Sequence, residues 1–490
     1  MSSAIPEPAP EHGSEPTPAP APAPEPAPAP EPTPVSLSKP APAFVPVGEV
    51  GGGAGPGGVG APGPGPGPVP SGVVPLGRSA TRAGGTRARE PFDRRLARAV
   101  QTITSRSLGP YQSAIVRIGF ALTWLVFLLR ELPHRHELYG PDSPWSWELA
   151  HRLISDNRAF TVLLWSDANP WFEFVYAVAV LSALLLLLGW RTRAVSVVFM
   201  VGVLSLLNRS VFVGDGGDNV LHLAAIYLVF TRCSQVWSLD ARRAAREARA
   251  ADAGEPPRQD RVGPLLWTVL GGFLLATTWF SGVSGEWWLP VLLWVLWLGN
   301  GLWWLVCRQA PDEPRTLLDA LANLAHNTAL LVLMAEVCLI YATAGWYKIQ
   351  GSRWQDGTAL FYPLNLDYFT PWPALSELLG TSGTMVMLLT YGTVLVQVAF
   401  PFTLFHRKVK NVLLVAMMLE HAGIAVLLGL PVFSLAMISA DAVFLPTPFL
   451  VALGVRTVRG RDRLLRRPGT GKLPEQRRTG EERAPRTLVG

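Results

Sequence analysis

Long runs of apolar residues dominate the middle of the chain and are missing from both of its ends. Between residues 109 and 452, stretches rich in Leu, Val, Ala and Trp alternate with shorter polar segments. A helix needs about 20 apolar residues to cross the hydrocarbon layer of a bilayer. We therefore expect an all-α polytopic membrane protein whose transmembrane domain comprises residues 109–452. The pattern predicts about ten spans, at residues 111–131, 171–189, 193–208, 217–234, 262–282, 286–306, 319–345, 381–405, 409–429 and 431–450.

The two ends of the chain have compositions that are typical of disordered segments. Residues 1–75 are built from Pro, Ala and Gly repeats such as PEPAPAPEP, and an arginine-rich stretch follows them. Such sequences cannot bury enough apolar surface to form a core. We therefore expect residues 1–108 to be a disordered tail, and residues 453–490 to be a second tail that is basic and disordered. The first residues do not resemble a secretory signal, because no apolar run follows a basic start.

Arginines and lysines are frequent in every second segment between the predicted spans and sparse in the others. If the N-terminus is cytoplasmic, the basic segments 191–193, 232–261 and 406–410 all fall on the cytoplasmic side, as the positive-inside rule requires. This pattern predicts an integral protein of the cell membrane with both termini in the cytoplasm. The polar loops that then lie outside are 132–170, 208–216 and 346–380.

The formal net charge of +6 does not indicate a nucleic-acid partner. The basic residues flank the ends of apolar spans, where they contact the head groups of membrane lipids, and no basic–aromatic module for nucleic acid is visible. The three cysteines, Cys233, Cys307 and Cys338, form no CxxC pair. Their spacing therefore predicts neither a metal site nor a disulfide framework.

A lysine ends one apolar run in the sequence YATAGWYKIQGSRW, residues 341–354. Gly345 is small enough to let a neighbouring helix approach closely. One interpretation of Lys348 is a surface anchor, with its amine among the lipid head groups and Trp354 in an aromatic belt. In the other interpretation the lysine faces the interior of the bundle. Burial there disfavours the ammonium and leaves a free amine that can act as a general base.

A second polar motif, GDGGDNVLH at residues 214–222, begins the fourth predicted span. In the simpler interpretation the two glycines form a turn and Asp218 caps the helix that follows. However, Asp218 and His222 are four residues apart, so they share one helix face and are placed to hydrogen-bond. Such a pair would orient the imidazole for acid–base chemistry. With Asn219, these two residues would line an outward-opening polar cavity.

Further ionisable residues lie inside the predicted spans, where they are costly and usually face protein or water. Glu420 and His421 are adjacent near the middle of the ninth span. Neighbouring residues on a helix point about 100° apart, so these two side chains cannot face one partner squarely. A buried structural histidine is one interpretation of His421, and a site residue is the other. The remaining members of this group are Arg117, Glu336 and Asp441.

Four stretches of the chain resemble the HTTM (horizontally transferred transmembrane) domain family, which shares its membrane domain with vitamin K-dependent gamma-carboxylase. They are RIGFALTWLVFLLR, LNRSVFVGDGGDNVLHLAAIYLVF, YATAGWYKIQGSRWQDGTALFYPL and EHAGIAVLLGLPVFSLAMI. The most specific elements are GGDN and the pattern AG-x-x-K followed by W-x-x-G-x-A. The matching stretches are spread over about residues 110–450.

The resemblance implies a carboxylase-like or quinol-epoxidising enzyme in which Lys348 deprotonates a vitamin K-type quinol at an outward-facing site. A lipid quinone and a secreted peptide substrate would then be its partners. We place Lys348, His222 and Asp218 among the catalytic candidates, and Trp354, Gly345, Asn219 and His421 among the candidates for cofactor contact.

This chain also departs from the carboxylase pattern. The interval between Lys348 and Trp354 is longer by one residue, and the large soluble domain of the carboxylase has no counterpart after residue 452. Two alternatives therefore remain open. In the first, the chain is a non-catalytic membrane protein that binds or moves a lipid or small solute. In the second, it is a maturation partner for secreted peptides.

Overall fold

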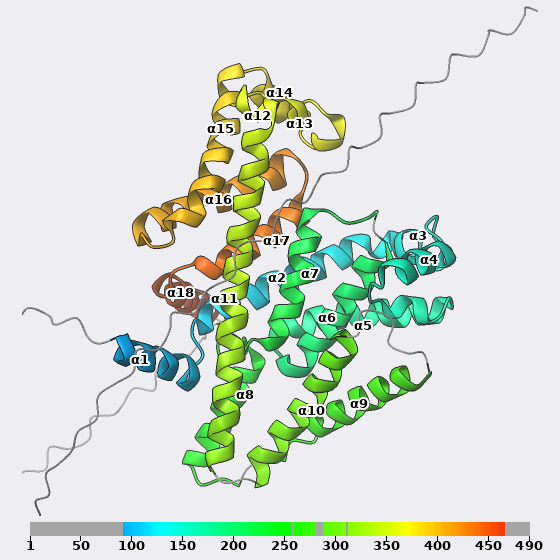
Figure 1. Cartoon of the computed structure of the whole chain (residues 1–490), viewed down its shortest axis with the longest axis vertical. Helices are drawn as coiled ribbons and strands as arrows, with labels where there is room; N and C mark the ends of the chain where they lie inside the picture. The colour runs from blue at the N-terminus through cyan, green and yellow to red at the C-terminus, as the bar shows by residue number, and fades with distance from the viewer. Residues whose placement is uncertain (1–91, 211, 257–258, 281–287, 310–311, 466–490) are drawn as a thin grey trace, which may run out of the picture. The chain divides into compact units, whose positions relative to one another are not determined.

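The computed structural model describes residues 92–465, apart from residue 211 and the segments 257–258, 281–287 and 310–311. Every regular element in this part of the chain is a helix (Figure 1), which confirms the all-α class. The disorder expected for residues 1–91 and 466–490 falls outside the described residues.

The helices have the following bounds. The α-helices are α1 (Phe92–Ser105), α2 (Pro110–Glu131), α3 (Arg135–Tyr139), α4 (Trp147–Asn157), α5 (Asn169–Leu188), α6 (Thr192–Arg209), α7 (Gly216–Phe230), α8 (Leu239–Asp252), α9 (Val262–Phe280), α10 (Trp288–Gln309), α11 (Asp312–Gln350), α12 (Ser352–Gln355), α13 (Phe361–Leu364), α14 (Pro373–Gly380), α15 (Gly383–Ala399), α16 (Arg407–Leu427), α17 (Pro431–Asp441) and α18 (Thr447–Leu465). Short 3-10 helices are η1 (Leu132–His134), η2 (Val162–Trp165), η3 (Asp367–Phe369), η4 (Phe400–Thr403) and η5 (Ala442–Phe444).

In the described part of the chain, 8 helical segments are long and apolar enough to cross a membrane, judged by length and composition. Each coincides with one of the ten spans expected from the sequence. These segments are Pro110–Tyr139, Asn169–Leu188, Thr192–Arg209, Val262–Trp279, Trp288–Gln309, Asp312–Gln350, Gly383–Thr403 and Arg407–Leu427.

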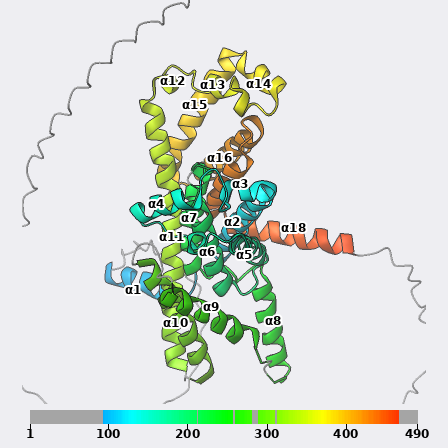
Figure 2. The same cartoon turned by 90° about the vertical axis from the view of Figure 1, so that its right-hand side faces the viewer.

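The other two expected spans differ from the prediction. The fourth is the 15-residue helix α7, which is shorter than a full span because it ends before Thr231. The tenth is broken, since α17 with η5 and the following α18 meet at an angle of 116°. Pro446 and Pro448 lie at this break, and proline interrupts a helix because it lacks a backbone N–H and restricts the residue before it. Figure 2 shows α18 extending to the right, away from the other helices.

Helices also extend into both segments that the sequence predicts to be disordered. Residues Phe92–Ser105 form α1, and α18 continues to Leu465. In both helices apolar residues recur among arginines, so a segment that is too polar to form a core can still form an amphipathic helix.

The best-buried part of the described chain lies where α2, α5, α6, α7, α11 and α17 pack together. Trp124 and Phe127 of α2 stack there with ring centroids 5.1 Å apart.

By contrast, most apolar side chains of α9 and α10 are exposed. A stacked pair of indoles, Trp267 and Trp297, joins these two helices at 4.2 Å, and each indole N–H donates to the other residue's carbonyl oxygen.

Arg117 is fully buried in α2 and supports the fold through carbonyl groups. Its guanidinium donates to the carbonyl oxygens of Leu186 at 2.6 Å, Leu187 at 3.1 Å and Trp237 at 2.8 Å. The last carbonyls of a helix have no partner within that helix, and α5 ends at Leu188. Arg117 therefore caps α5.

Candidate functional site

The amine of Lys348 is directed from the last turn of α11 toward α15. Its Nζ atom donates a hydrogen bond to Oε1 of Gln397 at 2.8 Å. The same Nζ atom lies 5.2 Å from the ring centroid of Trp354, a distance at which a cation is attracted to an indole face. The side chain is half-buried, so the structure places Lys348 against protein groups.

Gly345 makes this contact between α11 and α15 sterically feasible. A Cβ atom at this position would lie 2.6 Å from the Cγ2 atom of Val398, which is too close for any larger residue. Gln397 follows the start of α15 by about 14 residues, or roughly 21 Å along an ideal helix. The amine of Lys348 therefore lies well along the length of α15 and far from its N-terminal end.

Gln397 links Lys348 to an acidic residue on a third helix. Its Nε2 atom donates to Oε1 of Glu420 on α16 at 2.5 Å. The amide therefore accepts a hydrogen bond from the amine and donates one to the carboxyl group. We call Lys348, Gln397 and Glu420 the lysine network. It places a basic and an acidic side chain on either side of one amide.

A second set of buried side chains, which we call the tyrosine network, consists of Tyr341, His421 and Asp441. The Tyr341 hydroxyl donates to Oδ2 of Asp441 at 3.1 Å and lies 2.9 Å from Nε2 of His421. All three side chains are at most 2 % exposed. The tyrosine hydroxyl therefore contacts both the carboxyl group and the imidazole.

The two networks lie side by side because they use the same two helices. Tyr341 and Lys348 are about two turns apart on α11, which places them on one face. Glu420 and His421 are consecutive on α16 and point in different directions. As the helix geometry predicts, they have separate partners, with Glu420 on Gln397 and His421 on Tyr341.

The GDGGDN motif forms the start of α7. Asp215 and Asp218 make a reciprocal capping box, in which the Asp218 carboxylate accepts from the Asp215 N–H at 2.7 Å. The Asp215 carboxylate accepts from the Gly217 N–H, also at 2.7 Å. A Cβ atom on Gly217 would lie 2.9 Å from the Cα atom of Phe433. The motif therefore has a structural function, because it caps α7 and lets α17 approach.

The other predicted site residues of this motif do not join Lys348. Among the described residues, no hydrogen bond or ion pair joins Asp218 to His222, and none joins either residue to the two networks. Asn219 is exposed. Phe433 lies between the two regions, since its ring packs at 5.6 Å against His421 and its backbone packs against Gly217.

Glu336 lies on α11 beside a small cavity that is otherwise apolar. Within the described chain, neither of its carboxyl oxygens has a hydrogen-bond partner. The cavity has a volume of about 10 Å³, about the space that one water molecule needs. It is lined by Val116, Phe120, Val220, Ala224, Leu333, Glu336, Val337, Ala440 and Val443.

Two members of these networks are not among the residues that the sequence singles out. Gln397 is one amide in the apolar run YGTVLVQVAF, and Tyr341 is one tyrosine in the apolar span that precedes Lys348. A polar side chain inside a membrane helix usually hydrogen-bonds across to another helix, and this signal could have identified Gln397.

Among the residues that the structure describes, no group of three or more His, Cys, Asp or Glu side chains is placed to hold a metal ion. Comparisons of this chain with protein-family models, with curated proteins and with solved structures find no match.

Proposed function

We propose that this chain is an HTTM-type integral membrane protein of the cell membrane, with both termini in the cytoplasm, and that Lys348 is its catalytic base. The observation that carries the proposal is the hydrogen bond from Lys348 to Gln397. A lysine that only anchored the protein to lipid head groups would extend its amine toward water. Here the amine is half-buried and donates to Gln397, two residues before the C-terminal end of α15 at Ala399.

The residues around the amine fit an aromatic alcohol such as a quinol. A neutral amine accepts the proton of a weakly acidic hydroxyl group, and the indole face of Trp354 offers a stacking surface beside it. A bound quinol, of the vitamin K type or another lipid quinone, would supply this acidic hydroxyl. The cavity of about 10 Å³ beside Glu336 is too small for a quinone ring, so the ring would approach Lys348 from the lipid.

The lysine network supports this role because it stabilises the positive charge that forms when Lys348 takes a proton. The new ammonium donates to the carbonyl oxygen of Gln397, and the amide of Gln397 donates to Glu420. The carboxyl group of Glu420 is thus a counter-charge on the far side of the Gln397 amide. The π face of Trp354 adds a further attraction for the cation. These groups are in place before the proton moves, so little reorganisation is needed.

A non-catalytic function is the second candidate, and one observation favours it. Lys348, Gln397 and Glu420 already satisfy one another, and hydrogen bonds of this kind hold helices together within a membrane. In that function the protein binds or moves a lipid or a small solute, or acts as a partner in the maturation of secreted peptides.

A measurement of quinol turnover by the purified full-length protein distinguishes the catalytic from the non-catalytic function. The protein in lipid nanodiscs is given reduced quinone, oxygen and carbon dioxide, and quinone epoxide is followed by chromatography. We expect epoxide from the wild type and at least a hundredfold less from Lys348→Ala, a loss typical of a general base. The matched control is Lys410→Ala. This lysine also lies in a predicted span, but it donates to the Phe444 carbonyl.

We expect Lys410→Ala to keep the epoxide activity while losing some thermal stability. Equal turnover in the wild type and in Lys348→Ala, or no turnover in either, would overturn the assignment of Lys348 as the base.

A further inference from the structure

Helix α1 carries a row of apolar side chains that no other part of the described chain covers. Phe92, Leu96 and Val100 recur every four residues, so they lie along one face of the helix. They are 75 %, 53 % and 48 % exposed. Contiguous apolar surface of this kind on a helix usually marks a contact with another molecule or with lipid.

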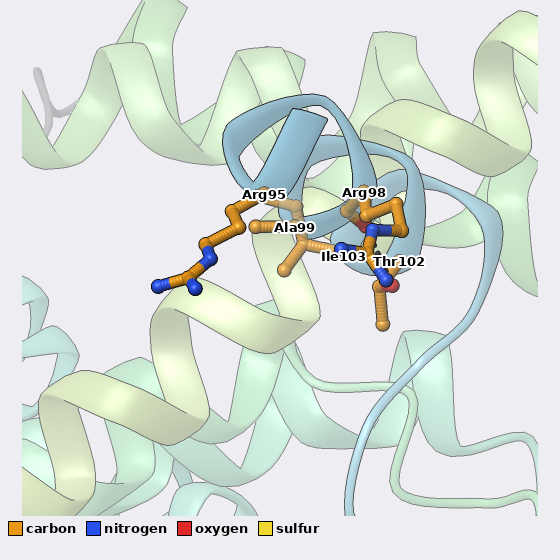
Figure 3. Close-up of a pocket in the computed structure, with 5 residues that line it drawn as sticks. All are labelled: Arg95, Arg98, Ala99, Thr102 and Ile103. Atoms are coloured by element: carbon orange, nitrogen blue, oxygen red, sulfur yellow. Dashed lines mark hydrogen bonds between the residues drawn. The ribbon is translucent and has the colours of Figure 1, made fainter. Parts of the chain in front are cut away.

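The opposite and flanking faces of α1 are basic. Arg94, Arg95 and Arg98 lie within the same three turns as the apolar row. Figure 3 shows the guanidinium of Arg95 extending away from the helix, beside a shallow depression whose lining also includes Ala99, Thr102 and Ile103. By helix geometry Arg95 flanks the apolar row, whereas Arg94 and Arg98 lie on the opposite face of α1. A helix with an apolar face and a basic polar face of this kind is complementary to a surface that is apolar inside and negatively charged at its edge.

The C-terminal end of α1 is fixed to α11 by side-chain hydrogen bonds. Asn323 donates to the Thr104 carbonyl at 2.9 Å, and Asn327 donates to the Ile103 carbonyl at 2.8 Å. Just after the helix, His326 Nε2 lies 2.8 Å from the Leu108 carbonyl. These bonds hold the C-terminal end of α1 against α11.

The position of α1 in the chain places it at a membrane surface. A turn at Gly109, with φ of 61°, leads directly into Pro110, where the first candidate span begins. The helix therefore lies at the level where that span enters the bilayer. Anionic phospholipids provide the negative edge and the apolar interior at this level.

We propose that α1 lies in the plane of the membrane and binds anionic phospholipid. Its apolar row enters the boundary between head groups and acyl chains, and Arg95, beside the row, contacts the lipid phosphates. Arg94 and Arg98, on the opposite face, add positive charge that attracts an anionic surface. The inference goes beyond the proposed quinol chemistry, because it concerns a different part of the chain and does not depend on Lys348.

The test measures where α1 lies in reconstituted full-length protein. The exposed Cys307 is replaced by serine, and a nitroxide label is attached at Leu96→Cys in the apolar row or at Gln101→Cys on the opposite face. Collision of each label with oxygen, which concentrates in lipid, is compared with collision with a water-soluble nickel chelate. In vesicles that contain phosphatidylglycerol, we expect the label at 96 to favour oxygen several-fold over the label at 101.

The contribution of charge is tested with the triple substitution Arg94→Gln, Arg95→Gln and Arg98→Gln. We expect the difference in the ratio of oxygen collision to nickel collision between labels at positions 96 and 101 to shrink when phosphatidylcholine replaces phosphatidylglycerol. It should shrink equally in the triple variant. Added inorganic phosphate should leave it unchanged, because free phosphate offers no apolar layer. Equal nickel collision at both positions in phosphatidylglycerol vesicles would overturn the membrane contact, and a difference that is independent of lipid charge would overturn the anionic specificity.

Discussion

The Nζ atom of Lys348 donates a hydrogen bond at 2.8 Å to Oε1 of Gln397, a residue 49 positions away on another helix. This bond fixes the direction of the lysine side chain, because it holds the amine against α15. Gln397 also donates to Glu420, so one amide joins a basic and an acidic side chain.

Replacing Gln397 by leucine should destabilise the protein and reduce quinol turnover together. The substitution keeps an apolar side chain in α15 but leaves the Lys348 amine and the Glu420 carboxyl without their shared partner. An unsatisfied buried polar group costs about 1–3 kcal/mol. Thermal unfolding in detergent measures the loss of stability, and epoxide formation measures the loss of function.

The matched control for this prediction is Gln350→Leu, which removes an exposed glutamine at the end of α11. Exposed substitutions usually change stability by less than about 0.5 kcal/mol. If Gln397→Leu behaved like Gln350→Leu in both measurements, the lysine network would have no role in stability or turnover.

Replacing Tyr341 by phenylalanine should lower stability by about 1–3 kcal/mol, since Oδ2 of Asp441 and Nε2 of His421 both lose their hydroxyl partner. The phenyl ring keeps the packing of the core. Tyr347→Phe is the control, because this side chain is 73 % exposed. Chemical denaturation of both variants in mixed micelles should separate them, and equal midpoints would show that the tyrosine network does not stabilise the bundle.

Replacing Gly217 by alanine should lower the free energy of unfolding by about 1–3 kcal/mol, the usual cost of overpacking a well-packed core. Its Cβ atom would meet the Phe433 Cα at 2.9 Å, and a backbone atom cannot move away as easily as a flexible side chain. At Gly423, in α16, a Cβ atom meets nothing within 4 Å. There we expect Gly→Ala to be neutral or stabilising by up to about 1 kcal/mol, through helix propensity. Unfolding midpoints that move in the same direction for both variants would contradict this contrast.

The ion pair between Arg191 and Asp260 should make a small, acid-sensitive contribution to stability. The Arg191 guanidinium holds the pKa of the Asp260 carboxyl at about 2, below the value of about 3.9 in an unfolded chain. Because the folded pKa is the lower one, the contribution is complete above about pH 4 and is lost as the pH falls toward 2. Asp260 is 43 % exposed, and solvent screening limits the gain to about a few tenths of a kcal/mol.

The measurement for this ion pair is the difference in thermal midpoint between the wild type and Asp260→Asn, followed from pH 7 to pH 2. The difference should shrink toward zero at the acidic end. Asp252→Asn, at an exposed position of α8, should show no such trend. A difference for Asp260→Asn that grew on acidification would have the wrong sign for a depressed pKa.

Hydrophobic periodicity alone predicted most of the helices, because the length and composition of an apolar run are local properties of the sequence. Eight of the ten expected spans coincide with candidate spans of the structure. The differences arise where capping and proline decide the ends of helices. The early end of α7 at Phe230 shortens the fourth span, and the prolines after Leu445 bend the tenth.

The residues of the candidate site also fall into two groups, those that the sequence indicates and those that only the structure reveals. Charged residues in apolar runs are conspicuous in a sequence, so Lys348, Glu420, His421 and Asp441 could be selected as candidates. Their partners Gln397 and Tyr341 are uncharged and do not stand out. The hydrogen bonds that join them span 23 to 100 positions.

Only the tertiary structure separated GDGGDN from Lys348. The sequence grouped Asp218, Asn219 and His222 with the lysine because their loops share one predicted face of the membrane. Packing instead places Phe433 beside Gly217 and uses the two aspartates to cap α7. A sequence pattern shows which face of a helix is apolar, but which helix meets that face depends on the close approach of segments far apart in the chain.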